Sequence, residues 1–450
     1  MVDVGTGPAV ARPSEADGPA ARRRERVPRA GWLVVGAVVV VALVVVALTV
    51  HLAPDPRPVG PAVPGLTFGV THTQDSVEPW NPKAARTRAS TVLSNVAPVQ
   101  AQSLMGWGAL NPEPRRDRYS WSSLDRRIDT ITGTGAEPVL TLCCAPDWMK
   151  GGTAGSTDWS RIEVAPDREH FDDFAALAAE AAKRYPEVHR FLVWNELKGF
   201  WDSGSNNWDI AAYTDLYNAV YRAVKEVRPD AEIGGPYIPL DSWSSSAAAG
   251  HPSAVSGSWG VLDQRPLDAI TYWLEHAVGA DFIAVDGGTE TRDRGLMVDD
   301  FDATEKLAAA TEWLRKATKL PIWWAEIYAN TNDPDASPGD PRRAAVMAEA
   351  LVRVARAGAS VALLWQPRAG SSLNSAALFT STATAHGGRK LPLDSLLEVV
   401  SKQLREDPRL VSTSWDAAAS RFTIRTPDKQ MVWSAAKGLQ GPTDPSGDGG

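Results

Sequence analysis

Two glutamates stand at the ends of apolar segments, Glu196 after residues 191–195 and Glu326 after residues 321–325. A charged side chain in such a place is costly unless it is paired or takes part in chemistry. Two facing carboxyl groups can cleave a glycosidic bond, because one protonates the leaving oxygen and the other attacks the anomeric carbon. The alternative is that each glutamate pairs with an arginine at the rim of the fold. Two such strand ends together favour the catalytic interpretation.

The segments that carry these glutamates belong to a longer series. From residue 66 the chain alternates short apolar runs with amphipathic stretches. Parallel strands need long crossovers, so this alternation predicts a parallel α/β sheet, and eight units predict a (β/α)8 TIM barrel. An open doubly wound sheet is the alternative, but no Gly-rich phosphate loop follows the first run. The expected strands are 66–72, 97–105, 137–145, 189–196, 232–238, 281–286, 321–328 and 360–366, and the expected helices are 167–185, 211–227, 302–317, 341–357 and 392–405.

A barrel of this kind has its active site at the carboxyl ends of the strands. Glu196 ends the fourth expected strand and Glu326 the seventh, so the two should face each other across one cleft. The other polar and aromatic residues near strand ends are candidates for contacts with a sugar, because rings and amides suit its faces and hydroxyl groups. These candidates are Asn195, Trp365, His72, Trp148, Tyr237 and Tyr328.

The segment Trp194-Asn195-Glu196 resembles the Asn-Glu acid/base signature of clan A glycoside hydrolases. The second glutamate, 326 − 196 = 130 residues further on, resembles the nucleophile of that clan. The details are most similar to family 39, the beta-xylosidase-like group, over about residues 66–405. The supporting segments are Tyr119-Ser-Trp-Ser-Ser-Leu-Asp125, Gly234-Gly-Pro236 and Asp281-Phe-Ile283.

The resemblance implies a retaining mechanism with Glu196 as acid/base and Glu326 as nucleophile. It also implies that Asn195 bonds the sugar 2-hydroxyl, that Trp365 forms the floor of the subsite, and that no cofactor or metal is used. Because a nucleophile must be ionised, we predict a normal or lowered pKa for Glu326.

The sequence departs from the family pattern at three places. Leu197 follows the acid/base where a proline is usual, and Gln100 or Gln102 stands where an arginine is expected on strand 2. Strand 6 ends in Asp286, where the clan often has histidine or tyrosine. These changes leave the two glutamates intact but put the identity of the sugar in question, so xylose is not assumed.

The amino-terminal part of the chain predicts a membrane anchor. Residues 31–50 carry no charge and are long enough to span a bilayer. Five arginines precede them, which places residues 1–30 in the cytoplasm as a disordered tail. A cleaved signal peptide is the alternative, but the apolar run is longer than usual and lacks a small-x-small cleavage site. We therefore expect a transmembrane signal anchor over 31–53, in contact with the lipid bilayer, and a Pro-rich linker over 54–65.

The remaining regions follow from composition. We expect the barrel over residues 66–406, a small antiparallel β appendage over 407–437 and a disordered tail over 438–450. A net charge of −8 argues against nucleic acid as a partner. The two cysteines, Cys143 and Cys144, are adjacent, and we expect two unpaired small residues in a buried strand.

The sequence thus predicts a single-pass cell-membrane protein whose extracellular barrel hydrolyses oligo- or polysaccharides of the surroundings or the cell envelope. Two other functions stay open. One is a weakly active or inactive protein for glycan binding or polysaccharide assembly. The other is a scaffold outside the cytoplasm, which predicts that Glu196 and Glu326 point away from a common cleft.

Overall fold

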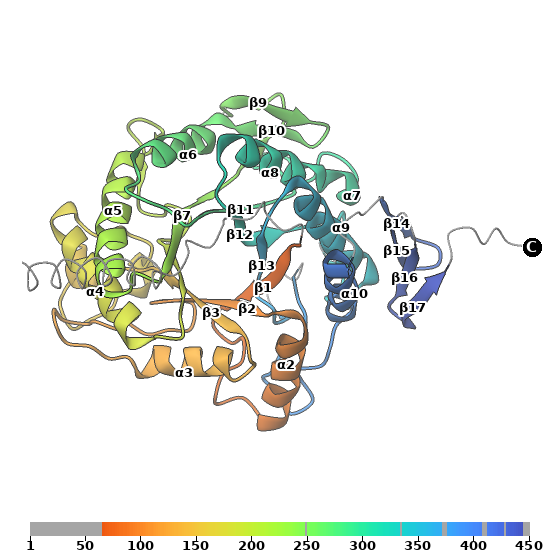
Figure 1. The fold of residues 1–450 in the computed structure, drawn as a ribbon, viewed down its shortest axis with the longest axis horizontal. Coiled ribbons are helices and arrows are strands. Elements are labelled where there is room, and N and C mark those ends of the chain that lie inside the picture. The colour runs from red at the N-terminus through yellow and green to blue at the C-terminus, as the bar shows by residue number, and fades with distance from the viewer. Residues whose placement is uncertain are drawn as a thin grey trace, which may run out of the picture. The chain divides into compact units, whose positions relative to one another are not determined.

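Eight parallel strands are hydrogen-bonded in a closed ring, in the order β1-β13-β12-β11-β7-β4-β3-β2 (Figure 1). The computed structural model describes residues 65–247, 250–333, 335–370, 376–406, 412–426 and 429–443. All eight strands predicted from the sequence are present, which confirms the (β/α)8 barrel. They are β1 (Thr67–Thr71), β2 (Val99–Ser103), β3 (Glu137–Leu142), β4 (Arg190–Val193), β7 (Glu232–Pro239), β11 (Phe282–Gly288), β12 (Ile322–Tyr328) and β13 (Val361–Trp365).

A ring of helices surrounds the strands, each with an apolar face toward the barrel (Figure 1). In α4, for example, Phe171, Phe174, Ala178 and Ala181 recur at helical spacing and are buried. The helices α2, α3 and α6 are absent from the prediction, although α2 buries two alanines, two valines and one leucine. The ring comprises α2 (Lys83–Val96), α3 (Ser122–Thr132), α4 (Phe171–Arg184), α5 (Ile210–Val227), α6 (Gln264–His276), α8 (Glu305–Ala317), α9 (Pro341–Ala357) and α10 (Pro392–Glu406).

The strands separate two apolar regions. One lies inside the barrel and the other between the strands and the helices, and successive residues of a strand alternate between them. On β11, Phe282 and Ala284 belong to the interior, whereas Ile283 and Val285 pack toward the helices. This alternation decides which residues at the strand ends face the barrel axis.

Two small sheets interrupt the connections after β4 and β7, and neither is in the prediction. A hairpin of β5 (Trp201–Asp202) and β6 (Asn207–Trp208) lies between β4 and α5. A three-stranded sheet of β8 (Ser242–Trp243), β9 (Pro252–Gly257) and β10 (Gly260–Asp263) lies between β7 and α6.

The carboxyl-terminal part is the expected antiparallel sheet. Its strands are β14 (Ser412–Asp416), β15 (Arg421–Arg425), β16 (Gln430–Ser434) and β17 (Gly438–Thr443), in that order. The expectation that disorder begins at residue 438 is wrong, because Gly438–Thr443 pairs with β16. The sheet is joined to α10 through the indole of Trp433, which donates to Ser395 Oγ at 3.0 Å.

The two cysteines form a disulfide bond with each other, so the expectation of unpaired residues is wrong. They lie immediately after β3, at a point where the chain turns tightly. The N–H of Cys143 donates to the carbonyl of Thr141, only two residues earlier, at 2.8 Å. A regular strand has no such turn, and here the turn occurs at the residue where the disulfide bond begins.

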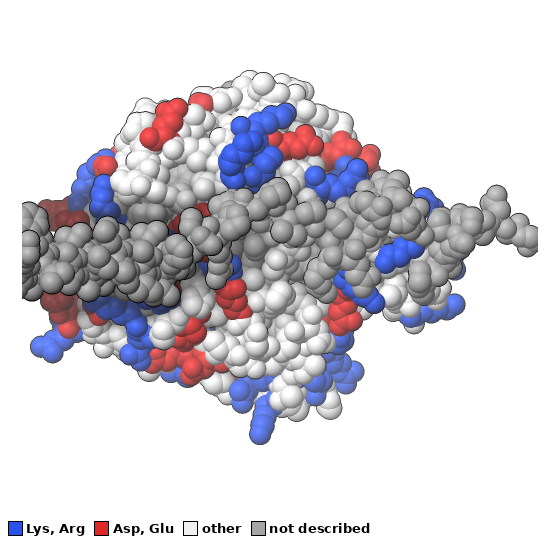
Figure 2. Space-filling view, in the orientation of Figure 1, with Lys and Arg blue, Asp and Glu red and all other residues white. Residues whose placement is uncertain are grey.

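Among the described residues, none of the helices has the length and apolarity to cross a membrane. The predicted anchor over 31–53 and the tail before it lie outside the described residues. On the face in Figure 2, the described Lys and Arg side chains are interspersed with Asp and Glu. Such a mixed surface lacks the one-sided positive field that attracts a phosphate backbone.

Candidate active site

Glu196 projects from a turn that follows β4. Trp194, Glu196 and Leu197 have φ values of 69°, 50° and 51°, so the chain leaves the strand direction abruptly. The buried indole of Trp194 donates to the carbonyl of Lys198 at 2.6 Å and packs edge-on against Phe174 and Phe200. Trp194 therefore fixes the turn from below and orients the carboxyl group of Glu196.

Glu326 faces the barrel because β12 contains an irregularity. Trp323 and Ala325 belong to the interior and Trp324 packs toward the helices, so regular alternation would turn residue 326 outward. The pairing with β11 skips one residue, since Val285 is opposite Trp324 and Asp286 is opposite Glu326. This bulge at Ala325 shifts the alternation by one residue. Ile327 accordingly packs toward the helices.

A third carboxyl group joins the two glutamates. One oxygen each from Glu196, Glu326 and Asp286 lie within 4.8 Å of one another. The shorter range for paired carboxyl groups, about 5–5.5 Å, leaves no room for a water between nucleophile and sugar, whereas roughly 6.5–9.5 Å would admit one. The two glutamates therefore converge on one point at the mouth of the barrel, as a direct attack on a sugar between them requires. The scaffold alternative, in which the two glutamates diverge, does not agree with this convergence.

Asp286 is a site residue that the sequence reasoning noticed only as a departure. It continues the interior series of β11, two residues after Ala284, so the period of two could have placed it. It is 3% exposed, and its Oδ1 has no hydrogen-bond partner. Burial, together with the charges of Glu196 and Glu326, raises the pKa of Asp286 well above its usual range.

Glu326 accepts hydrogen bonds from two phenols. Tyr237 donates to Oε1 at 2.5 Å and Tyr328 donates to Oε2. Burial, and next the charge of Glu196, raise the pKa of Glu326 to about 8, although both phenols oppose the rise. The prediction of a normal or lowered pKa is therefore wrong for the free enzyme, because Glu326 is only 1% exposed and has a second carboxylate beside it.

Lys198 supplies the positive charge of the site. Its Nζ lies 2.7 Å from Glu196 Oε2 and 2.7 Å from Glu163 Oε1. Burial opposes the charge of Lys198, but the two carboxylates outweigh burial and raise the pKa of the ammonium. The three clustered carboxyl groups are also the residues that could hold a metal ion. Two of them already have donors, however, because the phenols bind Glu326 and the ammonium neutralises Glu196.

Some of the predicted sugar-binding residues lie in this site. Asn195 is buried beside Glu196. Trp365 has the same phase on β13 as Val361 and Leu363, which face the interior of the barrel. It is half-buried at the mouth of the barrel and packs edge-on against Trp107, with 6.4 Å between the ring centroids. Tyr237 and Tyr328 contact the site through Glu326.

His72 and Trp148 are not brought to the glutamates. His72 shares the phase of Phe68 and Val70, which pack toward the helices, and its Nε2 lies 2.9 Å from Gln100 Oε1. Burial, with the nearby charge of Arg127, lowers the pKa of His72 to about 4. The indole of Trp148 donates to the carbonyl of Glu113 at 2.9 Å. Both side chains are therefore engaged in structural contacts.

The comparisons with known proteins agree with this geometry. A model of the glycosyl hydrolases family 39 matches residues 109–371. A beta-xylosidase of Geobacillus stearothermophilus is 29% identical over 129 residues, and the match covers only about a quarter of each chain, 27% of this one and 25% of the relative.

Solved structures of the family share the fold. A GH39 beta-xylosidase of Caulobacter crescentus superposes with a TM-score of 0.52 at 16% identity, covering 84% of this chain and 79% of the other. The GH39 enzyme of Xanthomonas axonopodis pv. citri gives 0.52 at 16% identity, covering 86% and 75%. The barrel and its paired glutamates define a clan A glycoside hydrolase fold. Within that clan, the chain belongs to glycoside hydrolase family 39.

Proposed function

We propose that this protein is a retaining glycoside hydrolase, with Glu326 as nucleophile and Glu196 as acid/base. The observation that carries the proposal is the convergence of these two carboxyl groups, whose oxygens lie within 4.8 Å at the ends of β4 and β12. The substrate class is an oligo- or polysaccharide of the cell envelope or the surroundings.

The residues divide the reaction between them. Glu326 attacks the anomeric carbon while Glu196 gives a proton to the leaving oxygen, which forms a covalent glycosyl-enzyme. Glu196 then takes a proton from a water that attacks the same carbon and releases Glu326. Tyr237 and Tyr328 orient Glu326 and stabilise its carboxylate. The stereochemistry at the anomeric carbon is inverted twice and so retained.

The test is turnover of aryl glycosides and polysaccharides by the wild type and by Glu326→Gln. We expect activity in the wild type and a loss of about 10³-fold or more in the variant, since the nucleophile is gone. NMR of the first-formed product should give the anomer of the substrate. An inverted product would refute the double displacement, and equal rates for the two proteins would refute the role of Glu326.

A second candidate function rests on Lys198. The ammonium of Lys198 forms an ion pair with Glu196 Oε2 and so occupies the proposed acid, which suits a glycan-binding protein with weak turnover. The two functions differ in turnover. A binding protein would show the same negligible turnover with and without Glu326→Gln, whereas a hydrolase would lose its turnover in that variant.

We also propose that the barrel is displayed outside the cell by the predicted anchor over 31–53. The apolar run and the arginines before it support this topology. The disulfide between Cys143 and Cys144 supports it too, because disulfides persist mainly in oxidising compartments. Protease treatment of intact cells should release the barrel. A barrel protected until the membrane is permeabilised would refute the topology.

A further inference from the structure

A groove of about 470 Å³ lies among the loops that follow β1, β2 and β3, within the roughly 300–1,000 Å³ typical of ligand sites. Three loops border it. They are the loop between β1 and α2 with Trp80, the loop between β2 and α3 with Trp107 and Leu110, and the segment after β3 with Trp159. These residues are far apart in the sequence, so only the fold brings them together.

Large apolar side chains are concentrated around this groove. Trp80 is 71% exposed, Leu110 58% and Trp159 46%. They are three of the eight large apolar residues that are exposed among the described parts of the chain. Apolar faces gathered in one concave place indicate a binding surface, whereas scattered ones need no explanation. Polar groups of Gln74, Asp75 and Glu163 also line the groove.

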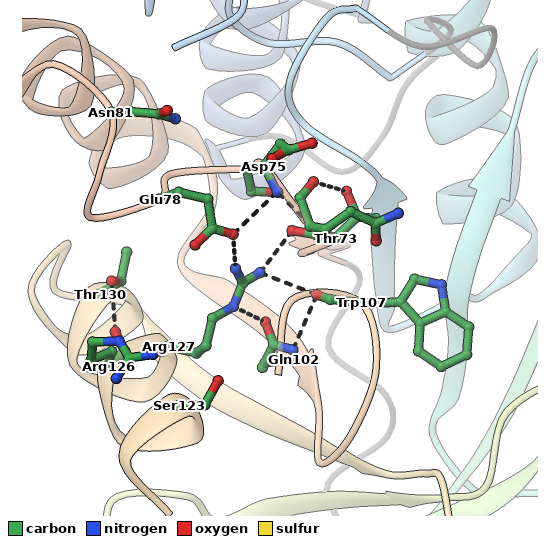
Figure 3. A network of polar contacts seen from close by, with 12 residues as sticks. Thr73, Asp75, Glu78, Asn81, Gln102, Trp107, Ser123, Arg126, Arg127 and Thr130 are labelled. Atoms are coloured by element: carbon green, nitrogen blue, oxygen red, sulfur yellow. Dashed lines mark hydrogen bonds and ion pairs between the residues drawn. The ribbon is translucent and has the colours of Figure 1, made fainter. Parts of the chain in front are cut away.

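The first two loops are held by one buried side chain (Figure 3). The guanidinium of Arg127, on α3, donates to Glu78 and to the carbonyl of Thr73 on the first loop. It also donates to Gln102 Oε1 at 2.6 Å and to the carbonyl of Trp107 at 3.3 Å. Gly108 has a φ of 101° and packs directly on this guanidinium, where a Cβ would meet Nη1 at 2.5 Å. The two walls are therefore fixed before any ligand arrives.

The third wall is held in a similar way. Lys150 Nζ donates to the carbonyls of Arg161 and Ile162, at 2.8 and 3.2 Å. Asp147 accepts from the N–H of Asp158 at 2.6 Å. Preformed walls reduce the entropy that a ligand loses on binding, so modest stacking contacts can contribute measurable affinity.

Two side chains, Trp107 and Lys198, link the wall of the groove to the proposed catalytic centre. Trp107 lines the groove and also contacts Trp365 at the barrel mouth. Lys198 bridges Glu163 of the groove wall to Glu196, and its ammonium lies 5.8 Å from the centroid of the Trp107 ring. A chain of sugars bound between the two glutamates would therefore extend over Trp107 and into the groove.

We infer that this groove is a distal sugar-binding subsite, in which Trp80 and Trp159 stack on the C–H faces of a glycan chain. The inference rests on the proposed function and adds to it that the substrate is an oligo- or polysaccharide of several units. Indole rings match the flat apolar face of a pyranose, and the neighbouring carboxylate and amide groups match its hydroxyls. A peptide is the alternative occupant, but the proposed catalytic centre next to the groove acts on sugars and gives no argument for a peptide.

The test compares Trp80→Ala and Trp159→Ala with the wild type on probes of different length. The probes are 4-nitrophenyl β-xyloside and β-glucoside against xylotetraose and cellotetraose. For whichever sugar is hydrolysed, we expect kcat/KM on the tetrasaccharide, relative to the monoglycoside, to fall about tenfold in each variant. Tyr272→Ala is the control, because Tyr272 lies on the outer helix α6, stacked on His276, and should leave the ratio unchanged.

Binding to Glu326→Gln separates this inference from the proposed function, since it needs no turnover. Calorimetry should give tighter binding of a tetrasaccharide than of the methyl monoglycoside, and Trp80→Ala in the same background should remove the difference. Absence of hydrolysis by the wild type would refute the proposed function alone. The inference of a distal subsite would be overturned if affinity did not increase from monoglycoside to tetrasaccharide. It would also be overturned if the increase were unchanged in both tryptophan variants.

Discussion

Lys198 Nζ lies 2.7 Å from Glu196 Oε2, so the proposed acid/base has an ion-pair partner two residues further along its own loop. The same ammonium binds Glu163 on the neighbouring wall. The position of the proposed acid is thereby tied to the segment that carries Trp159.

Replacing this ammonium should favour substrates that depend on acid catalysis. In Lys198→Gln, Glu196 loses this ion pair, so its carboxyl group is free to contact the leaving oxygen. We expect kcat/KM for poor leaving groups to rise about tenfold relative to activated ones. Rates on aryl glycosides with graded leaving groups measure this. Glu163→Gln, which removes only the outer partner of Lys198, is the control, and a uniform loss on all substrates would limit Lys198 to a structural role.

The pH dependence should report the pKa of Glu326, about 8 in the free enzyme. Glu326 must be ionised to attack, so kcat/KM for a dinitrophenyl glycoside should rise as pH increases through about 8. The hydrogen bond from Tyr328 stabilises the carboxylate of Glu326 and lowers its pKa. Tyr328→Phe removes this bond and should therefore move the rise to higher pH. Rates between about pH 5 and 10 decide the matter. A profile that falls on approaching pH 8 would contradict the assignment.

Glu326 should also influence stability. Its folded pKa of about 8 exceeds the unfolded value near 4.5, so between these values the folded state binds more protons and stability falls as pH rises. Glu326→Gln removes this loss. The variant should gain on the order of 4 kcal/mol over the wild type at pH 8 and almost nothing at pH 4. Urea unfolding at both values tests this, and a gain independent of pH would exclude titration as its cause.

The hydrogen bonds of the buried Arg127 guanidinium to the two loops should make a large contribution to stability. Arg127→Met leaves Glu78 buried without its partner and should cost roughly 3–5 kcal/mol in the free energy of unfolding. Adding Glu78→Gln should recover part of the loss, because the unpaired charge disappears. If Arg127→Met and the wild type had equal free energies of unfolding, the contacts of Arg127 would not contribute to stability.

The sequence predicts the barrel well because the same unit of apolar run and long connection repeats eight times. Each apolar run had the length of a strand and each was followed by a connection long enough for a crossover. The proposed nucleophile was harder to place from the sequence. Glu326 reaches the axis only through the bulge at Ala325, and an irregular pairing leaves no mark on the pattern of one strand.

Other site residues show where strand phase decides. His72 directly follows β1 and continues the phase of Phe68 and Val70, so the strand already indicates that His72 faces the helices. Asp286 follows Ala284 in the interior phase of β11, and the same reasoning would have placed it beside the glutamates. Lys198 and Glu163 meet through loop conformations that no periodicity encodes.

The bond between Cys143 and Cys144 joins neighbours in the chain, so it encloses no loop. A cross-link restrains the unfolded chain in proportion to the segment it closes, and here that segment is a single peptide unit. The bond therefore leaves the unfolded ensemble nearly as free as before. Its effect is local, on the backbone at the end of β3, and a reducing agent should leave the midpoint of thermal unfolding almost unchanged.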